Sequence, residues 1–296
     1  MTVETVQASR TGMWASLAVA LCGAIWGGFW LPLRWLETQG LGGAWVSVIF
    51  FGVAALVPLP FMLRKSAWEG FASQLVTGTL LGLAFTLYTV SLVMTEVINA
   101  ILLFYLTPVW STLAGMALLG ERMSWQRGLA IALGFGGMVF ILGFDNGLPL
   151  PSNPGDLLAL VSGMLWAAGT MRSFSRPSHG VSLPVFSFCL GGLAASLAVA
   201  GAAMALGSPV AALSDAGQAV PWAVLIALVF FVPPNFLVLW AAQRIDSGRV
   251  GILLMTEVLA GALTAWLFAG EDFGAMEFTG TALILCACLV EVLGRR

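Results

Sequence analysis

Ten apolar stretches, each about as long as a membrane-spanning helix, dominate this sequence of 296 residues. A helix needs about 20 predominantly apolar residues to cross the roughly 30 Å hydrocarbon core of a bilayer. The stretches are Met13–Leu36, Gly42–Leu63, Phe71–Met94, Val97–Leu119, Trp125–Phe144, Leu157–Phe174, Leu183–Leu206, Val220–Ala242, Val250–Ala269 and Phe278–Leu293. Because the connections between them are short, no room remains for a soluble catalytic domain. We therefore predict an all-α integral membrane protein with ten transmembrane helices.

The composition supports this class and excludes several kinds of function. Hydrophobic residues make up 59% of the chain and charged residues only 9%, whereas about 25% charged residues is usual in soluble domains. The single lysine, Lys65, follows no glycine-rich loop, and the single histidine, His179, excludes zinc sites built on paired histidines. The net charge is −2 and no basic tract occurs. We expect no metal, no cofactor and no nucleic-acid partner.

Basic residues are distributed unequally between the two sides of the predicted bundle. All 12 Lys and Arg residues except Arg34 fall on one side, and acidic residues gather on the other. In membrane proteins the cytoplasmic loops carry the excess of Lys and Arg. We therefore predict a multi-pass protein of the cell inner (plasma) membrane with both termini in the cytoplasm. The first span is too long for a signal-peptide core, so we expect it to be retained.

The two halves of the chain resemble each other where the fourth and ninth spans end. Leu118–Glu121 closes one span, and Phe268–Glu271 closes the other 150 positions later. A unit of five helices crosses the membrane an odd number of times, so its copy enters from the opposite face. An inverted repeat of this kind favours alternating access with a site near the midplane. The alternative is that similar apolar helices simply look alike.

We accordingly predict an inverted five-plus-five repeat within one membrane domain. The first five-helix repeat comprises residues 1–146 and the second comprises residues 147–296. Trp26 in the first span and Trp166 in the sixth span are expected at corresponding positions.

Glu257 is the most costly residue to place in the bilayer. It lies roughly 15 Å beyond the cytoplasmic end of its span, at about ten residues and a rise of 1.5 Å each. A charged carboxylate near the midplane costs at least about 2.5–3.5 kcal/mol. The small residues Ala260, Gly261 and Thr264 on its helix face indicate packing against other helices. We predict that Glu257 binds a substrate ammonium or couples transport to protons. The alternative is a protonated carboxyl group hydrogen-bonded to a neighbouring helix.

Prolines interrupt two of the predicted spans. Pro108 lies in the fourth span, and Pro233 and Pro234 lie in the eighth. Each proline removes one backbone hydrogen bond and frees a carbonyl group. Broken helices with freed carbonyls are frequent at transporter sites, although ordinary kinks have the same signature. We predict a helix-break or gating role for these three prolines.

Aromatic and amide side chains inside the spans complete the predicted site. Aromatic walls with a few polar groups are usual for small-molecule sites. The predicted substrate-binding residues are Trp26, Tyr88, Asn99, Tyr105, Trp166, Asn235 and Glu257. Any single deep aromatic residue is more often a packing residue than a ligand contact, so the prediction rests on the set.

Three short segments resemble a known family. Thr107–Trp110, the following Gly120-Glu121 and the first-span segment Ala24–Gly27 resemble the EamA-like branch of the drug/metabolite transporter superfamily. Within that branch the chain is most similar to YddG-type exporters of aromatic amino acids. The resemblance covers essentially the whole chain. It implies a basket-like bundle in which the first, third, fourth, sixth, eighth and ninth spans enclose the cavity.

Residues and resemblance together predict a secondary transporter rather than an enzyme. It would export amino acids, aromatic and other neutral ones, and related metabolites across the inner membrane by alternating access. Its partners would be the small-molecule substrate and the lipid bilayer, and it would function as a monomer. One alternative is a multidrug or quaternary-cation exporter of the same superfamily, and a distant one is a membrane enzyme acting on lipids. Whether transport is coupled to protons stays open.

Overall fold

The structure, a computed structural model, describes residues 3–41, 44–63, 68–95, 97–120, 123–142, 151–205, 217–269 and 274–293. All regular secondary structure in these residues is helical. In chain order the elements are α1 (Val3–Gly27), α2 (Trp30–Thr38), α3 (Ala44–Leu56), the 3-10 helix η1 (Leu59–Leu63), α4 (Phe71–Met94), α5 (Val97–Phe104), α6 (Thr107–Leu119), α7 (Trp125–Leu142), α8 (Pro154–Ser175), α9 (Ser182–Ala205), α10 (Val220–Ile226), the π-helical turn η3 (Ala227–Phe231), α11 (Val232–Ala241), α12 (Ser247–Leu254), α13 (Thr256–Ala269) and α14 (Ala275–Leu293).

Six apolar helical segments in the described residues are long enough to cross a membrane. They are Thr11–Leu33, Phe71–Ser91, Pro154–Ser175, Ser182–Ala202, Val220–Ala241 and Ser247–Phe268. The prediction of an all-helical chain with membrane-crossing helices is confirmed. The count of ten spans and the repeat stay predictions.

Several predicted spans are divided into two helices. The third predicted span has the bounds of α4, whereas the first corresponds to α1 and α2, the fourth to α5 and α6, and the ninth to α12 and α13. Proline explains the interruption of the fourth span, and in the eighth span two prolines follow the π-helical turn that joins α10 to α11. Pro108 lies in the first turn of α6, and Pro233 and Pro234 lie in the first turn of α11. The missing proline N–H has no helical partner in a first turn, so a helix starts there without loss of a bond.

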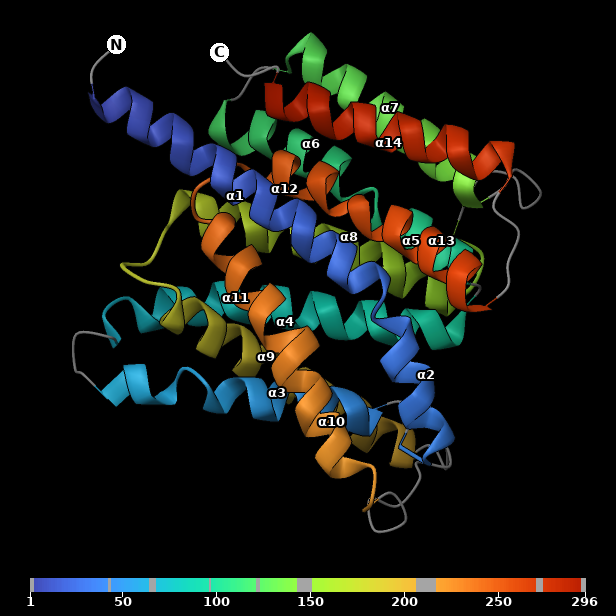
Figure 1. Cartoon of the computed structure of the whole chain (residues 1–296). Helices are drawn as coiled ribbons and strands as arrows, with labels where there is room; N and C mark the ends of the chain where they lie inside the picture. Colours follow the sequence, from blue (N-terminus) through green and yellow to red (C-terminus); the bar gives the residue numbers. More distant parts are fainter. Residues whose placement is uncertain are drawn as a thin grey trace.

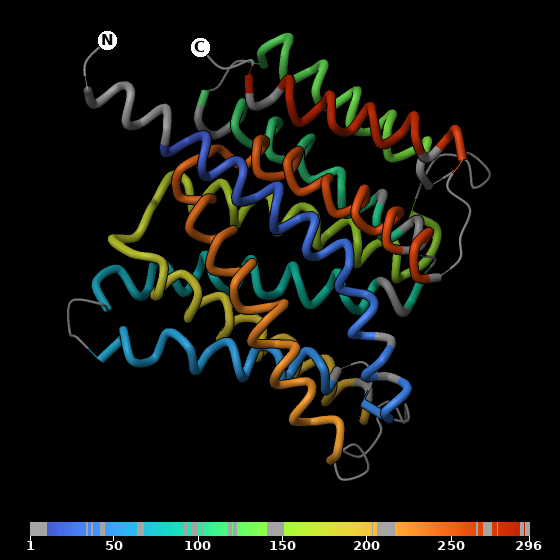
Figure 2. The backbone as a smooth tube through the Cα atoms, in the orientation of Figure 1, coloured from blue at the N-terminus to red at the C-terminus, as the bar shows by residue number. Residues whose placement is uncertain are grey.

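The helices form one bundle with a peripheral pair. Figure 1 shows α7 and α14 side by side at one edge, and these two pack extensively on each other. In the centre, α4 packs on both α8 and α9, while α1 packs along α11, α12 and α13. Figure 1 shows that α1 begins and α14 ends at the same end of the bundle, and Figure 2 traces the backbone between them.

Glycines permit the closest helix approaches. A Cβ atom on Gly27 of α1 would lie 2.7 Å from the backbone nitrogen of Gly261 on α13 and would overlap the carbonyl oxygen of Glu257. Likewise, a Cβ atom on Gly82 of α4 would overlap the backbone nitrogen of Gly192 on α9. Small residues let helix backbones approach in membranes, where lipid competes with ordinary apolar side chains for contact. The position of Glu257 therefore depends on the absence of a side chain at Gly27.

Candidate functional site

A hydrogen bond between Tyr105 and Glu257 joins two helix breaks. Tyr105 follows α5, before the start of α6, and it is only 1% exposed. Its hydroxyl donates to Glu257 Oε2 at 2.6 Å and lies 3.0 Å from the carbonyl oxygen of Leu254. Glu257 is half-buried in the first turn of α13. Two predicted site residues that are 152 positions apart are thus in direct contact.

The break between α12 and α13 explains why the Leu254 carbonyl meets a side-chain donor. In a continuous helix the N–H of Val258 would serve this carbonyl, but it donates to the Met255 oxygen at 3.0 Å instead. Among the described residues, no backbone N–H replaces it, and the Tyr105 hydroxyl is the donor within reach. A buried carbonyl without a donor costs about 1–3 kcal/mol. The facing phenol therefore stabilises the break.

Thr256 holds the same break against α1. Its hydroxyl lies 2.7 Å from the carbonyl oxygen of Ala20 and 2.9 Å from that of Leu253. Gly23 gives α1 the space for this contact, because a Cβ atom there would overlap the Thr256 hydroxyl. The backbone around Glu257 is consequently fixed from one side by α1 and from the other by Tyr105.

Aromatic rings extend from the Tyr105–Glu257 pair to α4 and α8. Phe104 stacks on Tyr88 with ring centroids 4.3 Å apart and an interplanar angle of 29°. The same ring meets Tyr105 edge-on at 5.3 Å and Trp166 at 6.3 Å. Tyr88, Tyr105 and Trp166 therefore belong to one aromatic group whose centre is Phe104, a residue that sequence reasoning missed. Its apolar side chain looks like any other core residue in the sequence.

Two buried indole groups, on α1 and α8, lack acceptors. The Nε1 atoms of Trp26 and Trp166 are buried and have no hydrogen-bond partner within the described part of the chain. Trp26 immediately precedes Gly27, which contacts the Glu257 backbone, and Trp166 contacts Phe104. Buried polar groups are normally hydrogen-bonded. These two donors are therefore available to an acceptor that the chain does not provide.

Asn235 lies in a different environment from Glu257. Its side chain is buried, and Nδ2 donates at 2.6 Å to the carbonyl oxygen of Phe231, the last residue of the π-helical turn. The Phe231 ring packs 5.3 Å from Phe51 and 5.5 Å from Phe85 in the same hydrophobic core, and Phe85 also meets the Trp26 ring at 6.3 Å. Asn235 thus supports its own helix next to the two prolines, and a role in substrate binding stays a prediction. The side chain of Asn99, on α5, lies outside the described residues.

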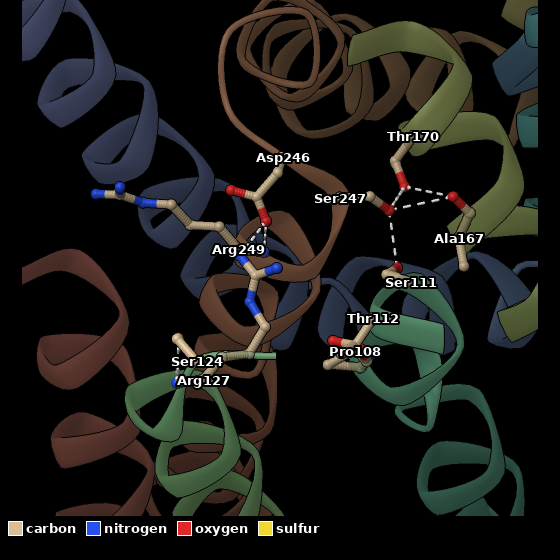
Figure 3. Close-up of polar contacts among 10 residues, drawn as sticks. All are labelled: Pro108, Ser111, Thr112, Ser124, Arg127, Ala167, Thr170, Asp246, Ser247 and Arg249. Carbon is tan, nitrogen blue, oxygen red and sulfur yellow. Dashed lines mark hydrogen bonds and ion pairs between the residues drawn. The ribbon is translucent and has the colours of Figure 1, made fainter. Parts of the chain in front are cut away.

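Figure 3 shows a second buried polar cluster, around the start of α12. Arg127 on α7 forms an ion pair with Asp246 at 2.5 Å. Beside it, the hydroxyl of Ser247 lies 2.7 Å from that of Ser111 on α6 and 2.6 Å from that of Thr170 on α8. We call these five residues the end cluster. The adjoining cavity of about 10 Å³ has room for about one water molecule, so the end cluster is a packed contact between helices.

Sequence reasoning missed most of the end cluster. Asp246 caps α12 by accepting a hydrogen bond from the backbone N–H of Arg249 at 3.1 Å. An Asp before a helical segment is a recognisable N-cap signal, so this part was open to prediction. The partners Arg127, Ser111 and Thr170 come from distant helices and have no such local signal. Within the described residues, no three His, Cys, Asp or Glu side chains gather as a metal site would require.

Comparisons with known proteins agree with a membrane transporter. The EamA-like transporter family matches the chain twice, over residues 13–143 and 153–293. An uncharacterized transporter of Archaeoglobus fulgidus is 29% identical over 263 residues, which are 85% of this chain and 88% of the relative. A riboflavin transporter of Rhizobium johnstonii is 28% identical over 304 residues, 93% of each chain.

A solved crystal structure has the same fold. It superposes with a TM-score of 0.70 at 20% sequence identity, over 95% of this chain and 99% of the other. At this identity the likeness concerns the fold alone. The family match, in contrast, spans both halves of the sequence and agrees with the apolar helices of the structure. The chain is therefore a multi-pass membrane transporter and belongs to the EamA-like transporter family.

Proposed function

We propose that this transporter exports amino acids, aromatic ones in particular, across the inner membrane by alternating access. The observation that carries the proposal is the Glu257 carboxylate held by Tyr105, together with two buried indole N–H groups on α1 and α8 that lack acceptors among the described residues. Tyr105 occupies Oε2 of Glu257, and Oε1 has no described hydrogen-bond partner. An ammonium group binds at Oε1, and the indoles of Trp26 and Trp166 donate to the carboxylate of the same substrate. Hydrogen bonds to ionised groups are the strong ones.

The aromatic group around Phe104 favours substrates with flat rings. Tyr88 and Phe104 already stack on each other, and the Trp166 ring stands at 60° to Phe104. Aromatic pairs are worth about 0.5–1.5 kcal/mol beyond their buried area. A phenylalanine or tryptophan side chain gains such contacts, whereas a small aliphatic side chain does not. This supports the aromatic preference of the proposed substrate.

Corresponding contacts in the two halves support the inverted repeat of residues 1–146 and 147–296. The Thr107 hydroxyl lies 2.6 Å from the Phe104 oxygen and 3.4 Å from the Gly163 oxygen of α8. Thr256 makes the equivalent pair of contacts in the second half, within its own span and to α1. Likewise α6 packs on α8 as α13 packs on α1. Each half thus contributes one broken helix that packs on the first helix of the other half.

The packing differs between the two ends, as a transporter in one state requires. At the end cluster, α6 and α8 both pack on α12. The corresponding pair at the opposite end, α5 and α13, has no comparable packing in the described ranges. The distribution of basic residues assigns the end cluster to the cytoplasmic side. In our proposal the end cluster closes the cytoplasmic side. The transporter opens to the cytoplasm only after the Arg127–Asp246 pair separates. Both termini face the cytoplasm, and one chain suffices.

A second candidate substrate is a larger planar ring system. One relative is named a riboflavin transporter, and the aromatic group around Phe104 suits such a ring. Riboflavin has no ammonium group and therefore would not need Glu257. A quaternary-cation exporter is the remaining alternative, since the carboxylate and the rings suit a cation equally well. The three possibilities differ in their dependence on the carboxylate.

Counterflow in proteoliposomes tests the proposal. Vesicles are preloaded with unlabelled phenylalanine, leucine, methyl viologen or riboflavin, and uptake of the same labelled compound is measured. We expect phenylalanine to exchange faster than leucine. Glu257→Gln should reduce phenylalanine exchange at least about tenfold, because a hydrogen bond to a charged group is worth about 1.5–3 kcal/mol. Exchange of methyl viologen or riboflavin without phenylalanine would refute amino-acid export.

A matched control separates the site from general charge effects. Glu69 is an exposed carboxylate before α4, and Glu69→Gln removes the same charge outside the helical bundle. We expect phenylalanine exchange by this variant to equal that of the wild type. A similar loss in both variants would show that Glu257 acts through net charge and not as a binding group.

A further inference from the structure

We infer that Glu257 exchanges one proton for one substrate ammonium, so that export of each amino acid is coupled to entry of one proton. The inference rests on the proposed function, since it uses the same carboxylate. It goes further by identifying the coupling ion and the place where proton and substrate exclude each other.

The count of donors and acceptors at the helix breaks carries the inference. The Tyr105 hydroxyl has one hydrogen but faces two acceptors, Glu257 Oε2 at 2.6 Å and the Leu254 carbonyl at 3.0 Å. With an ionised Glu257, one hydrogen must serve both. Adding a proton to Glu257 provides the missing donor, because its hydroxyl then donates to the Tyr105 oxygen and Tyr105 donates to Leu254. Only in this protonated state do the Leu254 carbonyl and the contact between Tyr105 and Glu257 Oε2 each have a hydrogen of their own.

No described cation replaces that proton. No basic side chain of the described residues lies within ion-pair distance of Glu257, and the facing titratable groups, Tyr105 from the α5–α6 break and Tyr88 from α4, carry no positive charge. On α7, Arg127 is engaged with Asp246.

Arg249 lies at the start of α12, where its backbone N–H donates to Asp246 Oδ1. The described thiols on the packed helices are engaged elsewhere. Cys22 on α1 donates to the Pro234 oxygen at 3.5 Å, and Cys288 on α14 donates to the Ile252 oxygen at 3.6 Å. Cys286 is exposed. A carboxylate at this depth is too costly to stay ionised without a partner. The transporter therefore changes conformation only when Glu257 carries either a proton or the substrate ammonium.

The charges balance through a simple cycle. In the outward-facing state a proton from outside binds to the Glu257 carboxylate. The protonated carrier turns inward, the proton leaves to the cytoplasm, and the ammonium of a cytoplasmic amino acid takes its place. The loaded carrier turns outward and releases the amino acid. One proton enters for each zwitterion exported, so one positive charge moves inward per cycle.

Proton release on substrate binding tests the inference with purified full-length protein. Phenylalanine is added to the detergent-solubilised transporter in weak buffer with a pH-indicator dye, and bound labelled phenylalanine is counted in parallel. We expect about one proton released per phenylalanine bound. Where Glu257 is protonated, the apparent Kd should rise about tenfold for each unit decrease in pH, since one proton is displaced per ligand.

Variants assign the proton to this carboxylate. Glu257→Gln should release no proton, and any residual binding should be independent of pH. Tyr105→Phe keeps the carboxylate but removes its hydrogen-bond partner, so the pH profile of binding should shift while the tenfold slope remains. Glu69→Gln should behave as wild type. If Glu257→Gln does not bind phenylalanine, the proton stoichiometry of the wild type and the pH profile of Tyr105→Phe still test the coupling.

The outcomes distinguish this inference from the proposed function. Phenylalanine binding without proton release, or with a Kd that is constant over pH, overturns the coupling and leaves amino-acid transport intact. Wild-type proton release by Glu257→Gln assigns the proton to another group and also overturns it. Absence of binding by any amino acid overturns both proposals.

Discussion

Two adjacent glycines offer a sharp test of how α1 positions Glu257. A Cβ atom on Gly27 would lie 2.6 Å from the Ala260 Cβ and 2.7 Å from the Gly261 nitrogen, besides overlapping the Glu257 oxygen. A Cβ atom on Gly28 meets nothing closer than 3.7 Å. Ordinary contact begins at 3.4 Å, so Gly27→Ala must move α13 by about 0.7 Å or more. Overpacking of this kind costs about 1–3 kcal/mol.

The displacement should also disturb the site. Hydrogen bonds between oxygen atoms are usually about 2.5–3.0 Å long, so a shift of about 0.7 Å is enough to break the 2.6 Å contact between Tyr105 and Glu257. We expect Gly27→Ala to lower the midpoint of thermal unfolding in detergent by several degrees and to slow phenylalanine counterflow. Gly28→Ala should match the wild type in both assays. Equal behaviour of the two variants would refute the close packing of α1 on α13.

Three further predictions concern buried polar contacts, and thermal unfolding measures each of them. Asp246→Asn should destabilise the protein by about 3–5 kcal/mol, because it leaves Arg127 beside a neutral partner in the end cluster; exchanging the two residues, Asp246→Arg with Arg127→Asp, should restore part of the loss, and no recovery would contradict the ion pair. Tyr105→Phe should cost about 1.5–3 kcal/mol, and less than that when Glu257 is already Gln; strictly additive losses would mean that the two residues do not interact. Asp156 is fully buried and accepts hydrogen bonds from Thr95 and Ser152, so Asp156→Asn should cost about 1–3 kcal/mol, and an unchanged midpoint would refute its role at the start of α8.

Local sequence signals predicted one of the helical breaks. Proline has no backbone N–H, so Pro108 was expected at an interruption, and α6 starts there. Pro233 and Pro234 follow a π-helical turn within a continuous helical segment, Val220–Ala241. The break between α12 and α13 has no proline. It arises where the facing Tyr105 supplies a hydrogen bond to the Leu254 carbonyl. No signal within the ninth span itself reveals this.

The candidate site was likewise predicted in part from the sequence and in part seen only in the structure. The cost of a carboxylate in lipid singled out Glu257, and depth and polarity suggested Tyr105 as a companion. Their direct contact depends on two distant helices meeting at their breaks. Phe104, at the centre of the aromatic group, was not predicted, since an apolar residue in an apolar span has no distinctive signature.

The sequence by itself determined that the chain is a bundle of apolar helices and that Glu257 needs a partner. Both follow from the free energy of placing single residues in lipid or in a helix, which depends on residue type and local position alone. Only the tertiary structure decided which residues are the partners: Tyr105 for Glu257, Arg127 for Asp246, and Thr170 for Ser247. These pairs depend on how rigid helices pack. That packing follows from the summed shapes of many small residues, Gly27 among them, and not from any one of them.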